Sequence, residues 1–149
     1  MGFFDKIKNA VTGGAAKVEV ETEMSYSMPG VTCWVKITVT STGSDLKSGG
    51  VFFDIVADES VSSSGSDGRS TTLATRTSEQ VVSIAPAFVL AAGESRVFQG
   101  EFTIPGDALP TYRGRNATHL WQVRGRVEMV GNDPDSGWLP LKIIDNYAG

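Results

Sequence analysis

The chain has 149 residues, 40% of them apolar and 20% charged, which is enough apolar content for one domain with a continuous core. Its formal net charge of −4 argues against a nucleic-acid partner, because a polyanion normally binds a basic face. Cys33 is the only cysteine and cannot form an intrachain disulfide, and the lack of any run apolar enough for a signal peptide or a membrane span predicts a cytoplasmic protein.

The N-terminal segment predicts a short amphipathic helix followed by a glycine hinge. Its apolar side chains recur at helical spacing, at Phe3, Phe4, Ile7 and Val11, and Gly13 with its neighbour would end the helix. A helix this short needs a surface to dock on, and three surfaces stay open: its own domain, a neighbouring subunit or a membrane. We therefore expect two units, residues 1–14 as helix and hinge and residues 15–149 as one domain.

From residue 17 the apolar period changes to two, which is typical of half-buried strands. Three such runs come first, at residues 18–24, 31–40 and 51–56. Cys33 lies in the second run, where a small buried side chain is its expected role. Residues 59–79 are rich in serine and threonine and predict a long exposed loop or a mobile hairpin.

The stretch from Arg96 to Met129 holds two more strand patterns joined by a corner. Pro105 and Pro110 cannot lie inside a central strand, so they mark the corner between the two patterns. A turn cluster at residues 131–137 and a short closing strand follow. About eight short strands without alternating helices predict an antiparallel β-sandwich, and its expected core includes Val35, Ile37, Phe53, Phe102, Trp121 and Val123.

Two stretches carry a resemblance to a known family. The pattern FTIP from Phe102, then LPTYRG from Leu109 and a following β run, resembles the hallmark of arrestin-like lobes. The start FFDKIKNAVTGGAAKVEV from Phe3 is similar to the bacterial sporulation-control branch of that group, and the likeness covers most of residues 3–147. The resemblance implies an all-β, immunoglobulin-like or arrestin-like sandwich with a short N-terminal helix and a non-catalytic adaptor or scaffold role.

The branch usually carries a second arrestin-like lobe, whereas this chain offers one. The resemblance therefore identifies a single-lobe variant, for which self-association would replace a two-lobed clamp. A self-assembling structural protein, joined by exposed strands and the N-terminal helix, is the alternative function.

Basic side chains gather near one predicted sheet. Arg124 and Arg126 would lie on the outer face of the last long strand, and Arg113 and Arg115 would come from the preceding corner. Such a group predicts either a patch that accepts an acidic or phosphorylated segment, or a solvated face balanced by the glutamates of residues 19–23. These four arginines, with Phe3, Phe4, Ile7 and Val11, are the candidate interaction residues.

The sequence shows no group of residues typical of a catalytic or metal-binding site. His119 is the only histidine and lacks a nucleophile motif around it, so a turn or surface position is its expected place. The oxygen-rich turn at Asn132, Asp133 and Asp135 lacks the EF-hand pattern and predicts an Asx turn. We therefore expect no enzyme, no metal site and no cofactor, and instead protein partners, with a homo-oligomer or peripheral membrane contact through the N-terminal helix as further alternatives.

Overall fold

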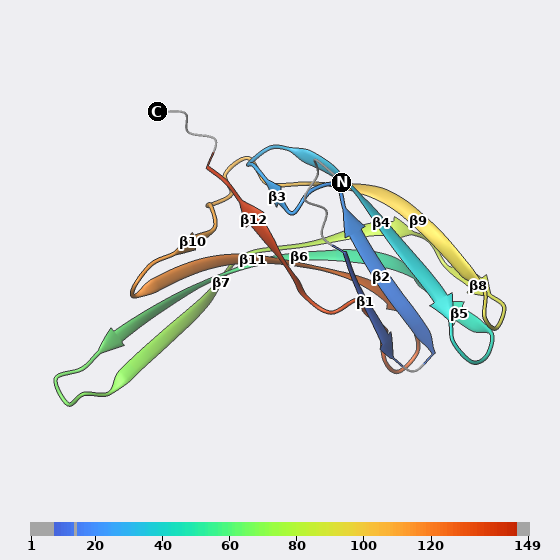
Figure 1. The fold of residues 1–149 in the computed structure, drawn as a ribbon, viewed down its shortest axis with the longest axis horizontal. Coiled ribbons are helices and arrows are strands. Elements are labelled where there is room, and N and C mark those ends of the chain that lie inside the picture. The colour runs from blue at the N-terminus through green and yellow to red at the C-terminus, as the bar shows by residue number, and fades with distance from the viewer. Residues whose placement is uncertain (1–7, 14, 146–149) are drawn as a thin grey trace.

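The structure, a computed structural model, describes residues 8–13 and 15–145 and is built of strands throughout this part of the chain. Figure 1 shows two sheets that cross, with a long two-stranded hairpin extending from one end of the molecule. The fold is all-β, and the inward side chains of the two sheets form one core.

The smaller of these sheets has four antiparallel strands, in the order β1 (Lys8–Gly13), β2 (Ala16–Thr22), β4 (Thr32–Ser41) and β9 (Ser95–Thr103). Side chains of β2 and β4 alternate between buried and half-buried along the strands. This is the period of two that the sequence shows, and it sets one face of the sheet on the core. A separate pair, β5 (Leu46–Ser48) with β8 (Phe88–Leu90), adds Leu46 and Leu90 to that core.

The larger sheet is organised around one long antiparallel pair. β11 (Ala117–Glu128) pairs with β6 (Gly50–Ser64) over its whole length, from Ala117 opposite Val61 to Glu128 opposite Gly50. The flanking strands are β7 (Ser70–Ala85) beside β6, and β3 (Tyr26–Ser27), β12 (Leu139–Ile143) and β10 (Tyr112–Arg113) on the side of β11. β12 and β3 run parallel, so the predicted antiparallel sandwich contains one parallel pair.

The expected core is confirmed. Five of its large members lie on the facing strands β4, β6 and β11, and each is almost fully buried: Val35, Ile37, Phe53, Trp121 and Val123. Phe102 of β9 is also buried, and its ring lies 4.9 Å from that of Phe53. The two sheets are close together at Gly125, where an added Cβ would lie 3.2 Å from the Ile37 side chain. A glycine at this position lets β11 come close to the opposite sheet.

The predicted N-terminal helix is corrected over its second half. Residues 8–13 form strand β1, which pairs with β2 in a register that sets Val11 opposite Val18 and Gly13 opposite Ala16. As the edge strand, β1 forms hydrogen bonds with the backbone N–H and C=O groups of β2. The free energy gained from this pairing outweighs the weak preference of so short a segment for a helix. Phe3, Phe4 and Ile7 lie outside the described residues.

Residues 59–79 form a hairpin and not a loop, so of the two predicted alternatives the hairpin is the one observed. β6 and β7 pair as far as Ser64 with Ser70, and Gly68 closes the turn with a φ of 80° that suits glycine. The last contact of this hairpin with β11 and its preceding turn is at Ser62, whose N–H donates to the Asn116 carbonyl at 2.7 Å. Beyond Ser62 the two strands pair only with each other among the described residues, and we call residues 61–73, a two-stranded projection, the arm. Figure 1 shows the arm extending well past the sandwich.

The prediction of a turn or surface position for His119 is wrong. His119 lies on β11, is buried, and has both ring nitrogens engaged: Nδ1 donates to the Pro110 carbonyl at 2.9 Å, and Nε2 is hydrogen-bonded to Thr77 Oγ1 at 2.6 Å. Thr77 is left unpaired where the β6–β7 register shifts by one residue, and this bulge turns its hydroxyl towards the histidine. The corner before β10 and the base of the hairpin are thereby tied to β11.

We expect Phe102→Ala to lower the free energy of unfolding by about 3 to 5 kcal/mol, because it removes a buried ring and leaves a cavity beside Phe53. Urea denaturation followed by tryptophan fluorescence measures the change. Val97→Ala on the same strand is the control, since Val97 is 59% exposed and should change stability little. An unchanged midpoint for Phe102→Ala would contradict the assignment of this ring to the core.

We expect the domain to fold without the arm. Val61 and Leu73 lie opposite each other, so an Asn-Gly turn in place of residues 62–72 would close the shortened hairpin with a favoured two-residue loop. The removed residues are almost all exposed, and the unfolding free energy should change by no more than about 1 kcal/mol. Loss of cooperative thermal unfolding in the shortened chain would show that the arm belongs to the fold.

Candidate functional site: a charged groove on the larger sheet

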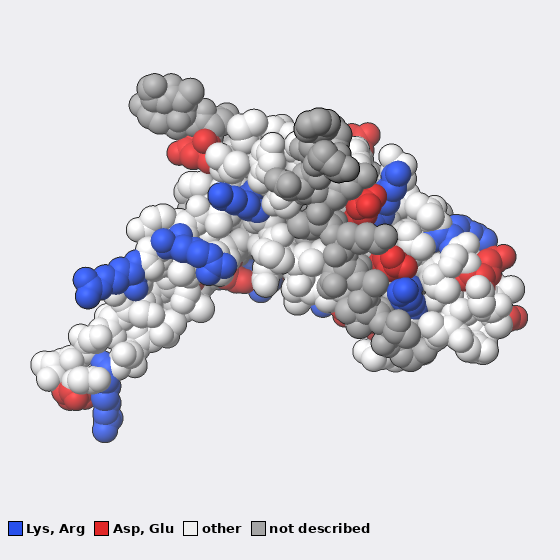
Figure 2. Space-filling model, in the orientation of Figure 1, with Lys and Arg blue, Asp and Glu red and all other residues white. Residues whose placement is uncertain are grey.

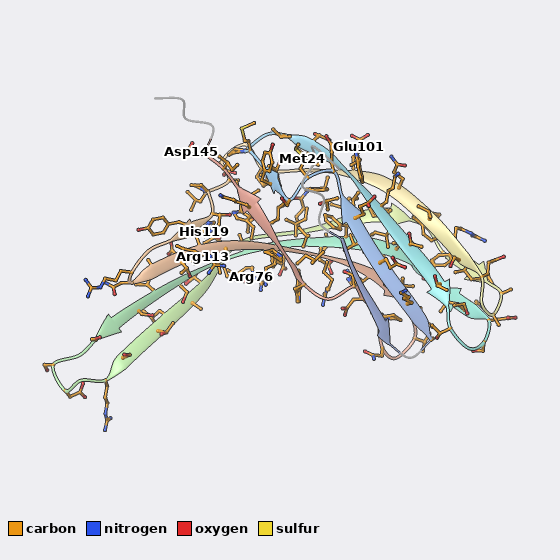
Figure 3. The ribbon with its side chains drawn as sticks, viewed as in Figure 1. Met24, Arg76, Glu101, Arg113, His119 and Asp145 are labelled. Carbon is orange, nitrogen blue, oxygen red and sulfur yellow. The ribbon has the colours of Figure 1, made fainter. Side chains whose placement is uncertain are left out.

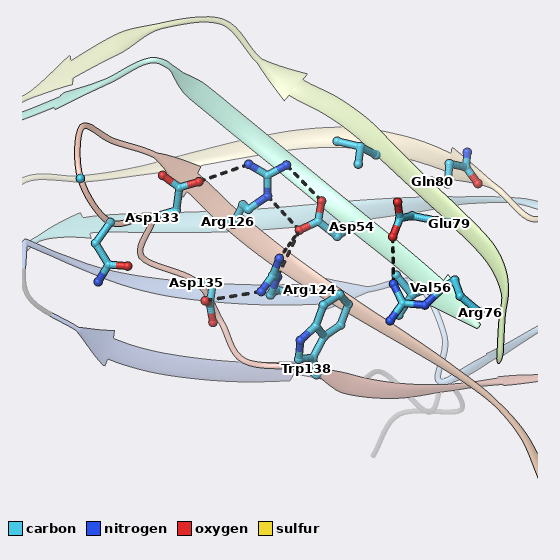
Figure 4. Close-up of a pocket in the computed structure, with 13 residues that line it drawn as sticks. Asp54, Val56, Arg76, Glu79, Gln80, Arg124, Arg126, Asp133, Asp135 and Trp138 are labelled. Carbon is cyan, nitrogen blue, oxygen red and sulfur yellow. Dashed lines mark hydrogen bonds and ion pairs between the residues drawn. The ribbon is translucent and has the colours of Figure 1, made fainter. Parts of the chain in front are cut away.

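A groove of about 650 Å³ lies on the outer face of the larger sheet. Strands β6, β7 and β11 form its floor, and the loop between β11 and β12 forms one wall (Figure 4). The alternation of β11 decides which side chains reach it, because Val123 and Val127 point to the core while Arg124 and Arg126 point outward.

Asp54 of β6 is the centre of the groove. It lies directly opposite Arg124 in the β6–β11 register, and its side chain is only 7% exposed. Arg126 binds it with a fork, Nε to Oδ2 at 2.9 Å and Nη2 to Oδ1 at 3.2 Å. Arg124 donates to the same Oδ2 from Nη2 at 2.9 Å and from Nε at 3.1 Å. One buried carboxylate thus accepts four charge-assisted hydrogen bonds from two arginines.

The loop after β11 supplies a second set of carboxylates. It turns back along the strand, with Val127 N donating to the Pro134 carbonyl at 2.9 Å and Ser136 N to the Gly125 carbonyl at 2.9 Å. Asp133 and Asp135 also cap this loop by accepting from backbone N–H groups, as the predicted Asx turn requires. The same two carboxylates face the arginines of β11.

These contacts neutralise the arginines of the groove. Arg126 Nη1 lies 3.4 Å from Asp133 Oδ2, and Arg124 Nη1 lies 3.8 Å from Asp135 Oδ2. The hydrogen bonds to Asp54 raise the pKa of the Arg126 guanidinium, so it stays charged. Four carboxylates and three guanidiniums line the groove, which gives it a formal charge of −1.

Aromatic rings hold the two arginines from the side. Arg124 lies over the Trp138 ring, 4.3 Å from its centroid, and Arg126 lies 4.9 Å from the centroid of Phe52. Stacking of a guanidinium on an aromatic face is favourable and restricts its rotamers. The arginines are therefore built into the sheet rather than free to wrap around a ligand.

The structure divides the four predicted arginines into two places. Arg124 and Arg126 are partners of Asp54, whereas Arg113 pairs with Thr118 at the other end of β11 and Arg115 lies in the turn between β10 and β11. The balancing carboxylates are Asp54, Asp133 and Asp135, not the glutamates of residues 19–23. The sequence did not reveal their role, because it depends on the pairing of β6 with β11 and on the β11–β12 loop, which folds back along β11.

Other predicted features have clear positions. Cys33 is buried on β4, 3.5 Å from Ser27 Oγ, and burial raises the pKa of its thiol, as expected for a structural cysteine. No group of three or more metal-ligating side chains lies together among the residues that the structure describes. The described part of the chain also contains no helix that could cross a membrane.

The fold is similar to that of a solved sporulation control protein. A crystal structure of Spo0M, a sporulation control protein from Bacillus subtilis, superposes with a TM-score of 0.65 at 18% sequence identity. The superposition covers 88% of this chain and 50% of Spo0M, so the chain spans about half the length of that neighbour. No protein-family model matches the sequence, and no curated protein matches it. The predicted resemblance to the sporulation-control branch is confirmed at the level of the fold.

We expect Asp54→Asn to destabilise the protein by about 3 kcal/mol, because it removes the negative charge between two partly buried guanidiniums. Chemical denaturation of the variant measures this change. Asp58→Asn is the matched control, since Asp58 pairs with Arg76 on the surface of the same strand and an exposed pair contributes little. Equal stability of the two variants would show that Asp54 does not hold the groove together.

Proposed function

We propose that this protein is a non-catalytic adaptor or scaffold that acts through protein–protein contacts. The observation that carries the proposal is the arm, a hairpin with continuous strand pairing that contributes no side chain to the core. Its two large apolar side chains are exposed, Val61 at 43% and Leu73 at 70%. Apolar side chains held away from the core on a projecting element favour a surface that a partner covers.

The edge of β7 adds a second means of contact. β7 is the last strand of its sheet, and residues 70–75 carry no charge and no proline. Natural sheets usually protect such edges with charged residues, proline or a covering element. An unprotected edge can receive an extended segment of a partner through backbone hydrogen bonds.

The fold suggests where such an adaptor would work. Spo0M is by its description a sporulation control protein, and its likeness to this chain supports partners in sporulation control for this protein as well. We place the protein in the cytoplasm, where its single unpaired cysteine would remain reduced. The sporulation-control partners and the cytoplasmic location are thus both proposed for this protein.

Self-assembly is the second candidate, and the same strand edge favours it. Two copies of β7 could pair antiparallel across a two-fold axis, because the stretch from Ser70 to Thr75 has no charges that would repel each other. A self-assembling protein would use the arm to bind its own copy, whereas an adaptor would use it to bind another protein.

Site-specific crosslinking distinguishes the two candidates. With a photoreactive amino acid in place of Leu73, we expect a crosslinked product with a different protein in cells, because Leu73 is the more exposed of the two large apolar side chains of the arm. The same amino acid in place of Lys47, an exposed residue on β5 that is not part of the arm, is the control and should give no such product.

The size of the product gives the answer. A product of twice the chain's mass, matched by a dimer in light scattering, would support self-assembly instead. The product should also disappear when Val61, which lies opposite Leu73, is changed to aspartate. No product from the arm position would contradict both candidates.

A further inference from the structure

A second pocket lies on the outer face of the larger sheet, where β10, β11 and β12 meet. Its volume is about 460 Å³, within the range of pockets that hold small ligands or a few side chains. Four residues of β11 and β12 line it, Leu120, Trp121, Pro140 and Leu141, and of these Leu120 and Pro140 have their side chains on the outer face. The side chains of Trp121 and Leu141 are almost fully buried and belong to the core, so the sheet beneath the pocket is packed on its other face.

Hydrogen-bond donors complete the lining. Arg113 comes from β10, Gln122 from β11 and Lys142 from β12, and all three are exposed. Thr111 Oγ1 accepts from Ile143 N at 2.8 Å, which leaves its hydroxyl hydrogen able to donate to a ligand. Among the residues that the structure describes, no aspartate or glutamate lines this pocket.

The cations of this pocket differ from those of the charged groove. Arg124 and Arg126 are each within hydrogen-bond distance of Asp54, but the described residues provide no ion pair for Arg113, Arg115 or Lys142. Arg115 adds a third exposed cation in the turn next to Arg113. Figure 2 shows basic side chains gathered over the region of β10 and β12, and Figure 3 labels Arg113 on the same side of the molecule.

We propose that this pocket binds an acidic segment of a partner protein, in which a glutamate or aspartate lies next to an apolar side chain. The carboxylate would accept from the Arg113 guanidinium, the Lys142 ammonium and the Thr111 hydroxyl. The neighbouring apolar side chain would lie against Leu120 and Pro140. This assignment rests on the proposed adaptor function and adds to it the chemistry of the partner.

The charge distribution favours a peptide over a membrane surface. A lipid surface attracts a protein through many cations, each of which contributes only a small part of the binding. Here three cations stand against a formal net charge of −4, so a broad anionic surface would also meet the acidic remainder of the chain. A single short segment can reach the cations without that repulsion.

The test uses the full chain and a short fluorescein-labelled peptide that alternates glutamate with phenylalanine. We expect saturable binding by fluorescence anisotropy, with shifts of the Leu120, Gln122 and Lys142 amide signals in NMR spectra. Replacing both cations, with Arg113→Gln and Lys142→Gln, should weaken binding by at least about tenfold, since each removes a charge-assisted hydrogen bond. Raising the salt concentration should also weaken it, because the cations are exposed.

Two controls keep the test specific. The matched protein control is Lys36→Gln with Lys47→Gln, which removes the same charge from exposed or half-buried positions outside the pocket and should leave the affinity unchanged. The matched peptide control has glutamine in place of glutamate and should not bind. Because these substitutions replace surface side chains, circular dichroism should show the wild-type fold in both double variants.

The proposal is overturned if the acidic peptide does not bind, if it binds both double variants equally, or if vesicles containing phosphatidylglycerol bind through Arg113 and Lys142 while the peptide does not. Crosslinking from position 73 separates this outcome from the proposed function. If crosslinking to another protein persists although the peptide fails to bind, the adaptor proposal stands and only the pocket is wrongly assigned.

Discussion

The antiparallel pairing of β6 with β11 is the constraint on which the other features depend. The pair runs without a register shift from Val61 opposite Ala117 to Gly50 opposite Glu128. Because side chains alternate across a strand, this single register sends Phe53, Trp121 and Val123 to the core and sets Asp54 beside Arg124 on the outer face. A slip of one residue would bury the arginines and expose the tryptophan, so the core and the charged groove support the same register.

The outer face of the larger sheet has two charged regions, one in which the cations are paired with carboxylates and one in which they are exposed. Around Asp54 the arginines are paired, stacked on rings and partly buried, and such an arrangement restrains structure more than it binds ligands. Towards β10 and β12, Arg113 and Lys142 lie exposed around a pocket whose described lining residues include no carboxylate. The position of a cation relative to its nearest carboxylate therefore distinguishes a structural arginine from one available to a partner.

The sandwich and the arm use their apolar side chains differently: those of the sandwich stabilise the fold, and those of the arm are available for contact with a partner. The sandwich buries its apolar side chains between two sheets, whereas the arm keeps Val61 and Leu73 exposed and is held to the body at its base by Thr77 and His119. The histidine is buried with both nitrogens satisfied, as a structural polar group requires. A firmly held base would present the apolar side chains of the arm in a constant orientation, which lowers the entropic cost of binding a partner.

The sequence by itself determined the fold class, the strands with clear alternation and the six core residues, because a period of two directly reports which side chains face a sheet interior. It also contained the motifs that resemble arrestin-like lobes. It could not show that residues 8–13 are a strand, since the pairing of β1 with β2 is a gain made only in the folded protein. Nor could it separate Arg124 from Arg113, or place His119 in the interior, because both depend on which strands lie side by side and on how loops return to them. Strand pairing joins residues far apart in the chain, and only the tertiary structure decides it.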